Sequence, residues 1–151
     1  FFRQPAHLKM VFQLIEPQLQ RGSIVLCDRF TDSTLAYQWG GRGVPRETIE
    51  AAQALATSGV APDLRVLLDL PVSVALARRH ADTESVNRFD AEQVKFHQAV
   101  RDTYLGLACH NPDEWMVIDA GVSEHDVVET TYRRIYDWLT AFLERRSIDG
   151  S

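Results

Sequence analysis

Three short apolar runs, separated by helical patterns, set the fold class of this 151-residue chain. They extend from Ser23 to Asp28, from Asp63 to Pro71 and from Trp115 to Ile118, the last leading to Asp119. Runs of this length and apolar content are typical of the buried strands of a parallel sheet. Because strands that alternate with helices form βαβ units, we expect a three-layer α/β fold, a parallel sheet with flanking helices.

Apolar residues at helical spacing predict the helices between these strands. The first is expected from Leu8 to Leu19 with a kink or a restarted turn at Pro17, and the next from Asp32 or Ser33 to Trp39. Further helices are expected to begin at Pro45, Pro71 and Ser123, and another to include Phe96, Val100, Tyr104 and Leu107. Their predicted buried faces include Ile49, Ala52, Leu55 and Ala56, then Val74, Leu76 and Ala77, and finally Val128, Thr131, Ile135, Leu139 and Phe142.

The composition suits one soluble domain, predicted at residues 1–146, with a frayed tail at residues 147–151. The formal net charge of −5 argues against a nucleic-acid-binding surface, which normally shows a basic face. No apolar run approaches the roughly 18 residues of a membrane span, and no signal-peptide pattern opens the sequence, so a cytoplasmic protein is expected. The two cysteines, Cys27 and Cys109, fit neither a disulfide framework nor a metal site, and Cys27 is expected to be buried.

Charged and polar residues gather where the first predicted strand ends. In open α/β sheets, ligands bind at the carboxyl ends of the strands. There, Asp28 can hold the water shell of a metal ion or a proton, and Arg29 can bind a phosphate in bidentate fashion. The alternative interpretation is a structural ion pair at the end of the strand.

The helix predicted after this pair places four polar or aromatic residues on one face, namely Ser33, Thr34, Tyr37 and Gln38. They offer hydroxyl and amide hydrogen bonds to a pyrimidine edge and an aromatic wall for stacking, although such residues also serve as ordinary helix caps. Glycines at 40, 41 and 43 allow the backbone to approach a ligand closely. Arg42 between them either faces a phosphate or is solvated at the turn.

The order and spacing of these pieces resemble the thymidylate kinase family. The matching segments are Asp28-Arg29-Phe30, then Ser33-Thr34-Leu35-Ala36-Tyr37-Gln38, then Gly41-Arg42-Gly43. The resemblance implies a P-loop kinase fold and phosphoryl transfer from ATP to dTMP with Mg²⁺, giving dTDP and ADP. It also implies that Asp28 lies near the metal ion and the phosphates, that Arg29 binds the 5′-phosphate of the acceptor, and that the helix at residues 33–38 reads the nucleoside.

The resemblance continues to the later strands. Val66–Pro71 and the helix after it resemble the family's approach to its lid, expected at about residues 78–90. Arg88, within Asn87-Arg88-Phe89-Asp90, and with it Arg78 and Arg79, are implied to close over the donor phosphates. The segment Trp115–Gly121 resembles the final strand and the loop that borders adenine, which implies donor contacts for Ala120 and Gly121.

The sequence departs from the family pattern in two places. No G-x-x-x-x-G-K-S/T motif occurs in these 151 residues, so we expect the P-loop and the amino-terminal strands of the fold to be missing. Counting back from Pro17 without gaps, His7 stands where the family has an arginine, and Arg3 takes that place if an insertion is allowed. Two alternatives stay open: a kinase for another deoxynucleotide, and an inactive nucleotide-binding remnant. A homodimer is expected on resemblance alone.

Overall fold

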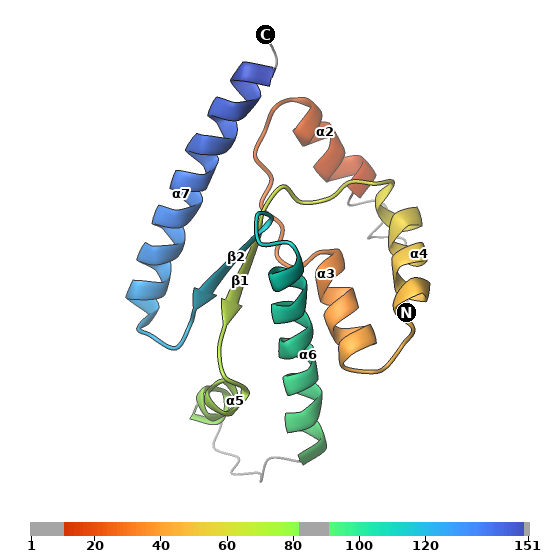
Figure 1. The fold of residues 1–151 in the computed structure, drawn as a ribbon, viewed down its shortest axis with the longest axis vertical. Coiled ribbons are helices and arrows are strands. Elements are labelled where there is room, and N and C mark those ends of the chain that lie inside the picture. The colour runs from red at the N-terminus through yellow and green to blue at the C-terminus, as the bar shows by residue number, and fades with distance from the viewer. Residues whose placement is uncertain (1–10, 82–90, 150–151) are drawn as a thin grey trace.

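A computed structural model describes residues 11–81 and 91–149 of the chain. Helices dominate it, and they surround a small parallel sheet (Figure 1). Along the chain the elements are η1 (Val11–Ile15), α2 (Glu16–Gln20), α3 (Thr31–Thr34), η2 (Leu35–Gly40), α4 (Arg46–Thr57), β1 (Arg65–Asp69), α5 (Val72–Ala81), α6 (Ala91–His110), β2 (Trp115–Asp119) and α7 (Glu124–Asp149), where η marks a π-helical segment.

The sheet consists of β1 and β2, which pair in parallel with Arg65 opposite Trp115 and Asp69 opposite Asp119. The crossover between them contains α5 and α6. In Figure 1, α6 and α7 lie on opposite sides of the strand pair, so that helices flank the sheet on both sides. The predicted parallel pairing of the second and third apolar runs is therefore confirmed.

The first apolar run does not form the predicted strand. Residues 23–27 carry no regular secondary structure, and Ile24 and Leu26 are 67% and 89% exposed. A strand needs a neighbour that binds its backbone N–H and C=O groups, and no described segment pairs with these residues. Cys27, which we expected to be buried in this strand, is exposed for the same reason.

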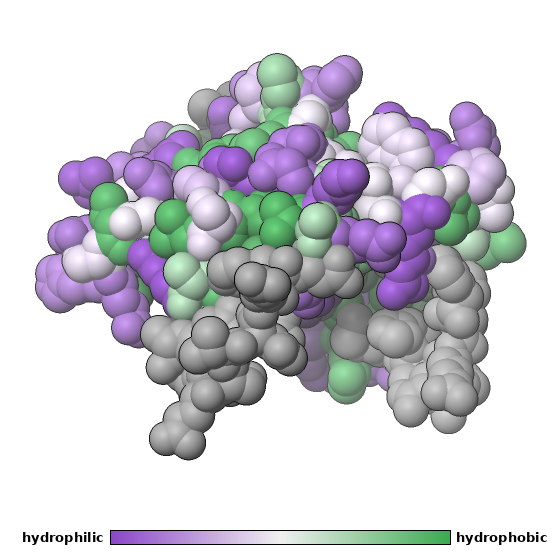
Figure 2. Space-filling view, turned by 90° about the horizontal axis from the view of Figure 1, so that it is seen from below, coloured by the Kyte–Doolittle hydropathy of each residue, from purple (hydrophilic) through white to green (hydrophobic). Residues whose placement is uncertain are grey.

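One part of the core involves the sheet, α5 and α6, and its buried members are Met116 and Ile118 of β2, Val72 and Leu76 of α5, and Val100 and Ala108 of α6. The other buried hydrophobic residues belong to η1, η2 and α4, and they are Val11, Ile15, Leu35, Ala36 and Ile49. Burial is less complete than the sequence predicted, because Val66 and Leu68 expose the second face of β1. Seen from the side toward which both strands point, hydrophobic residues stay visible at the centre of the surface (Figure 2).

Four positions predicted on buried helix faces are exposed, namely Leu55, Val74, Ala77 and Val128. Leu55 is 81% exposed because it lies six residues, about 240° around α4, from the buried Ile49. Val74 lies two residues, about 200°, from Val72 and from Leu76, the two residues that α5 buries. Val128 lies about 100° around α7 from the half-buried Val127. In each helix other predicted positions are buried or half-buried, among them Ile49, Leu76 and Ile135, so the predicted faces are correct apart from these exposed positions.

The helix ends follow local chemistry. The first helix changes from π to α geometry next to Pro17, which confirms the predicted restart there. The Ser123 hydroxyl accepts from the Asp126 N–H at 3.2 Å and donates to its carboxylate at 2.6 Å, so Ser123 is the predicted cap of α7. α7 then continues through Asp149, past residue 146 where a frayed tail was expected.

Within the described part of the chain, no helix is both long and apolar enough to span a membrane.

Two glycines let α6 approach η2 closely. A Cβ at Gly41 would lie 2.5 Å from a ring carbon of Phe96, and a Cβ at Gly40 would overlap the Thr103 side chain. These two glycines therefore serve helix packing in this structure, rather than the close approach to a ligand that the sequence suggested. Gly43 instead has a φ of +69° and continues the turn after η2.

A carboxylate–guanidinium pair holds α6 at the carboxyl end of β1. Arg101 donates from Nε and from a terminal nitrogen to the two carboxylate oxygens of Asp69, at 2.7 and 2.8 Å. These hydrogen bonds hold the pKa of Asp69 below its ordinary value, against the opposing effect of partial burial. The bidentate geometry fixes the direction of the Arg101 side chain as well as its distance.

We expect Gly40→Ala to lower the free energy of unfolding by about 1–3 kcal/mol, because the new methyl group cannot fit against α6. Gly106→Ala is the matched control, since Gly106 lies inside α6 with no atom within 4 Å of its missing Cβ. This control is expected to raise the free energy of unfolding by roughly 0.5–1 kcal/mol. Urea unfolding of both variants measures the difference, and an equal effect of the two would contradict the packing described above.

The pair of Asp69 and Arg101 predicts a pH-dependent loss of stability. Because the folded pKa of Asp69 is lowered, its contribution is present above the unfolded value of about 3.9 and is lost as the pH falls through the folded value. Arg101→Gln should therefore cost roughly 1 kcal/mol at pH 7 and progressively less in acid. Urea unfolding as a function of pH tests this, with Arg133→Gln on the exposed surface of α7 as the control.

Candidate functional site

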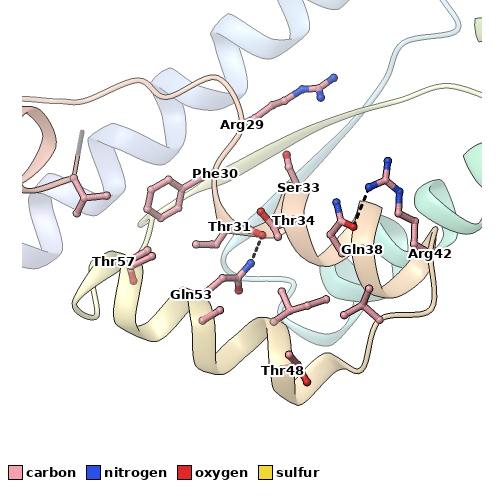
Figure 3. Close-up of a pocket in the computed structure, with 15 residues that line it drawn as sticks. Arg29, Phe30, Thr31, Ser33, Thr34, Gln38, Arg42, Thr48, Gln53 and Thr57 are labelled. Atoms are coloured by element: carbon pink, nitrogen blue, oxygen red, sulfur yellow. Dashed lines mark hydrogen bonds between the residues drawn. The ribbon is translucent and has the colours of Figure 1, made fainter. Parts of the chain in front are cut away.

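A cavity of about 600 Å³ opens between α4 and the segment that runs from Arg29 through α3 and η2 (Figure 3). Five of the residues singled out in the sequence line it. These are Arg29, Ser33, Thr34, Gln38 and Arg42. The other lining residues are Val11, Phe30, Thr31, Val44, Thr48, Ile49, Ala52, Gln53, Ala56 and Thr57. Polar and apolar side chains are therefore mixed in its wall, and α4 contributes both kinds.

Arg29 enters the cavity wall from a left-handed backbone conformation, with φ of +64°. A residue other than glycine adopts this conformation at a cost of roughly 1–2 kcal/mol. The guanidinium carbon lies 5.5 Å from the centre of the Tyr37 ring, so the ring supports the charge by a cation–π contact. The guanidinium hydrogen bonds to no side chain in the described residues, which leaves its donors available to an anion.

Tyr37 contacts α6 as well as Arg29. Its ring meets the edge of Phe96 at a centroid distance of 5.9 Å. It does not line the cavity directly, in contrast to the other residues predicted on this helix face. The Tyr37 ring therefore contacts Arg29 and α6, and its predicted stacking on a ligand stays a prediction.

Ser33 lines the cavity and is held from the opposite side by Tyr104 of α6. The Tyr104 hydroxyl donates to the Ser33 Oγ at 2.7 Å. Burial raises the pKa of the Tyr104 phenol, and the hydrogen bond to Ser33 acts in the opposite direction. The Tyr104 ring also packs edge-on against Trp115 at a centroid distance of 6.4 Å.

The two residues before Ser33 are held by other elements. The Gln53 amide of α4 donates to the Thr31 carbonyl at 2.6 Å (Figure 3). Arg65, at the start of β1, donates to the Asp32 carboxylate at 3.0 Å and to Glu114 at 2.8 Å. On the next turn, Arg42 donates to Gln38 at 3.2 Å, and the two side chains occupy one rim of the cavity.

A second group of predicted residues lies at the carboxyl ends of the strands. Arg78 donates to the Ala120 carbonyl at 3.0 Å, and the Gly121 N–H donates to Asp119 at 2.7 Å. Figure 1 shows that α5 and the loop after β2 follow the two strands at this end. Of the other predicted donor residues, Arg88 lies outside the described residues, and so does the side chain of Arg79.

The two groups lie at opposite ends of β1. The cavity side contacts Arg65, the first residue of the strand, whereas the Ala120 N–H donates to the carbonyl of Asp69, the last. A five-residue strand spans about 13 Å. The expectation that the first apolar run brings Asp28 and Arg29 to the same sheet edge is therefore wrong for this structure, because that run does not join the sheet.

Asp28 is exposed and lies outside the cavity lining. No hydrogen bond or ion pair of the described residues uses its carboxylate. Within the same residues, no group of three or more histidine, cysteine or acidic side chains could hold a metal ion. Asp28 alone is thus compatible with a cation that takes its remaining ligands from water and phosphates, as Mg²⁺ commonly does.

Comparison with known proteins adds to this geometry. The family model described as thymidylate kinase matches residues 4–131. A thymidylate kinase of Thermomicrobium roseum is 42% identical over 130 residues, and one of Desulfovibrio desulfuricans is 45% identical over 142 residues. One of Geobacter sp. is 47% identical over 119 residues. These alignments cover 86%, 90% and 76% of this chain.

The chain belongs to the thymidylate kinase family. It spans 62%, 64% and 53% of the length of the same three relatives. In this chain, five residues of the segment that was predicted to bind the acceptor line the cavity, namely Arg29, Ser33, Thr34, Gln38 and Arg42.

Sequence reasoning missed the contribution of α4 to this site. The polar residues Thr48, Gln53 and Thr57 interrupt an otherwise apolar inward face of the helix, next to Ile49 and Ala56. A polar residue on a buried helix face needs a hydrogen-bond partner or a cavity. That interruption was the signal in the sequence that α4 borders a polar site.

The left-handed backbone at residue 29 predicts a difference between two substitutions. Arg29→Gly should have a free energy of unfolding about 1 kcal/mol above that of Arg29→Ala, because glycine adopts this φ without steric cost. Both variants lack the guanidinium, so the comparison removes the effect of the lost cation–π contact. Urea unfolding checks it, and a glycine variant no more stable than the alanine variant would exclude strain at this residue.

Proposed function

We propose that this protein is a thymidylate kinase, which transfers the terminal phosphoryl group of ATP to dTMP and produces dTDP and ADP. The observation that carries the proposal is the cavity of about 600 Å³, which gathers five residues of the family's acceptor motif in one wall. Its volume is within the range of small-ligand sites, roughly 300–1,000 Å³. Family membership supports the reaction class.

The cavity provides complementary groups for the parts of a pyrimidine nucleoside monophosphate. Arg29 offers a planar, always charged group to the phosphate, and Arg42 supplies a second cation on the rim. Thr34 and Gln38 can hydrogen bond to the base, while apolar side chains of α4, with Ile49 as the most buried, receive its carbon edge. This division of polar and apolar contacts is typical of specific small-molecule sites.

The donor side of the proposal relies on the second group of residues. Arg78, Arg79 and Arg88 would neutralise the phosphates of ATP, and Ala120 with Gly121 would border the adenine. Asp28 would hold Mg²⁺ through its water shell, and the ion would stabilise the charge on the phosphates. Catalysis by such a site is mainly positioning and charge stabilisation.

The family also supports a homodimer as the proposed assembly, and another deoxynucleotide as the alternative acceptor. Nothing in the arrangement of the cavity distinguishes a 5-methyl group from hydrogen by direct hydrogen bonding, since a methyl group is recognised by shape.

Calorimetric titration with dTMP, with uridine and cytidine monophosphates as competitors, tests acceptor binding. We expect selective binding of dTMP, and Arg29→Ala should weaken it at least about tenfold, because a charge-assisted contact to the phosphate is lost. Arg145→Ala, near the end of α7, is the control, because it makes the same substitution outside the cavity, and this variant should bind dTMP as the unmodified protein does. Failure of dTMP to bind, or normal binding by Arg29→Ala, would contradict the assignment.

A coupled assay of ADP formation separates the kinase from a protein that only binds nucleotide. The protein is supplied with ATP, Mg²⁺ and dTMP, and ADP release is followed with and without dTMP. Formation of ADP that depends on dTMP supports the kinase. Selective dTMP binding without ADP formation would instead favour the nucleotide-binding alternative.

A further inference from the structure

The start of α3 lacks a cap of its own. Its N-cap residue is Phe30, which makes no side-chain hydrogen bond to the helix, whereas serine, threonine, aspartate or asparagine would. α3 proper contains only Thr31–Thr34 before the π-helical segment begins. A helix this short is unstable in isolation, so tertiary contacts must fix its position.

Three elements supply these contacts, one to each of three consecutive residues. Gln53 of α4 binds Thr31 at 2.6 Å, Arg65 of β1 binds Asp32 at 3.0 Å, and Tyr104 of α6 binds Ser33 at 2.7 Å. Of these three contacts, that of Tyr104 acts on a side chain that faces the cavity.

We infer that Tyr104 is a positioning residue for the acceptor site, which orients the Ser33 hydroxyl toward the bound nucleotide. This inference rests on the proposed function, since it assigns a role within the same cavity. Tyr104 does not line the cavity, so it acts through Ser33 and does not touch the acceptor.

The direction of the hydrogen bond gives the mechanism. A phenol is a stronger donor than an alkyl hydroxyl, so Tyr104 donates and the Ser33 oxygen accepts. The Ser33 proton then points away from Tyr104 and is available to an acceptor atom of the nucleotide. Without Tyr104, the Ser33 hydroxyl rotates freely, and binding must pay for ordering it.

The placement of Tyr104 is itself fixed on both sides. Three residues earlier on α6, Arg101 binds Asp69 at the carboxyl end of β1. The close approach of Thr103 to Gly40 holds the same turn of α6 against η2. Because these contacts lie within one turn of the helix, a small movement of the Tyr104 hydroxyl relative to Ser33 is resisted by packing.

Tyr104→Phe tests the inference, since it removes the hydroxyl and keeps the ring against Trp115. We expect it to weaken dTMP binding about threefold to tenfold in calorimetry. In a Ser33→Ala background it should have no further effect, because the group that it orients is gone. Tyr136→Phe, on the exposed face of α7, is the matched control and should bind as the unmodified protein does.

If Tyr104 served only to stabilise the fold, Tyr104→Phe would lower the free energy of unfolding, and its effect on dTMP affinity would not depend on the residue at position 33. Unchanged binding by Tyr104→Phe, or equal weakening in both Ser33 backgrounds, therefore overturns the inference.

A ligand-free measurement separates failure of this inference from failure of the proposed function. Amide hydrogen exchange at residues 31–35 should accelerate at least about threefold in Tyr104→Phe, while exchange in α7 stays unchanged. If the unmodified protein does not bind dTMP but exchange accelerates locally, the proposed acceptor is wrong and Tyr104 still orders this helix. If exchange does not change, the positioning role is refuted whatever the protein binds.

Discussion

The site depends on how closely α6 approaches the π-helical segment η2. Gly40 and Gly41 leave no side chain between the two helices, so Thr103 and Phe96 of α6 pack directly on the backbone of η2. Interaxial distance in helix pairs is set by the side chains at the contact. The packing on α6 therefore fixes the position of η2 and of the side chains that η2 places in the cavity wall. The short α3, which continues into η2, is positioned by the same 20-residue helix.

α6 also has side chains that bind near both ends of β1. Arg101 reaches the last residue of the strand, and Tyr104, one helical turn later, reaches α3 beside the first. The residues that resemble the donor site follow the carboxyl ends of the strands, where Arg78 meets Ala120. The proposed phosphoryl transfer would require donor and acceptor groups to be held in a fixed relation, and α6 has side chains bound near both groups of residues.

The sequence predicted every described helix and both strands of the sheet, because the helices have clear apolar periodicity and the two strands are short apolar runs separated by helical patterns. Five residues of the motif that was predicted to bind the acceptor line one cavity, and their binding role stays a prediction. The prediction failed for residues 23–28, since apolar content cannot show whether a strand finds a pairing partner. Tyr104 could not be assigned, because its hydrogen bond to Ser33 spans 71 residues and leaves no local pattern. Gln53 left a polar interruption of the α4 face in the sequence, but that interruption does not show its partner Thr31, which lies 22 residues away.

Arg29, proposed to bind the acceptor phosphate, has a backbone conformation that is unfavourable for a residue other than glycine. Its left-handed φ is one that glycine adopts without strain, so selection for folding alone would favour glycine there. Directed evolution toward heat resistance, without an assay for nucleotide binding, would therefore tend to enrich loss of the guanidinium. Thermal stability is then a misleading measure of fitness at this residue, and a library screened for both properties should separate into two populations at position 29.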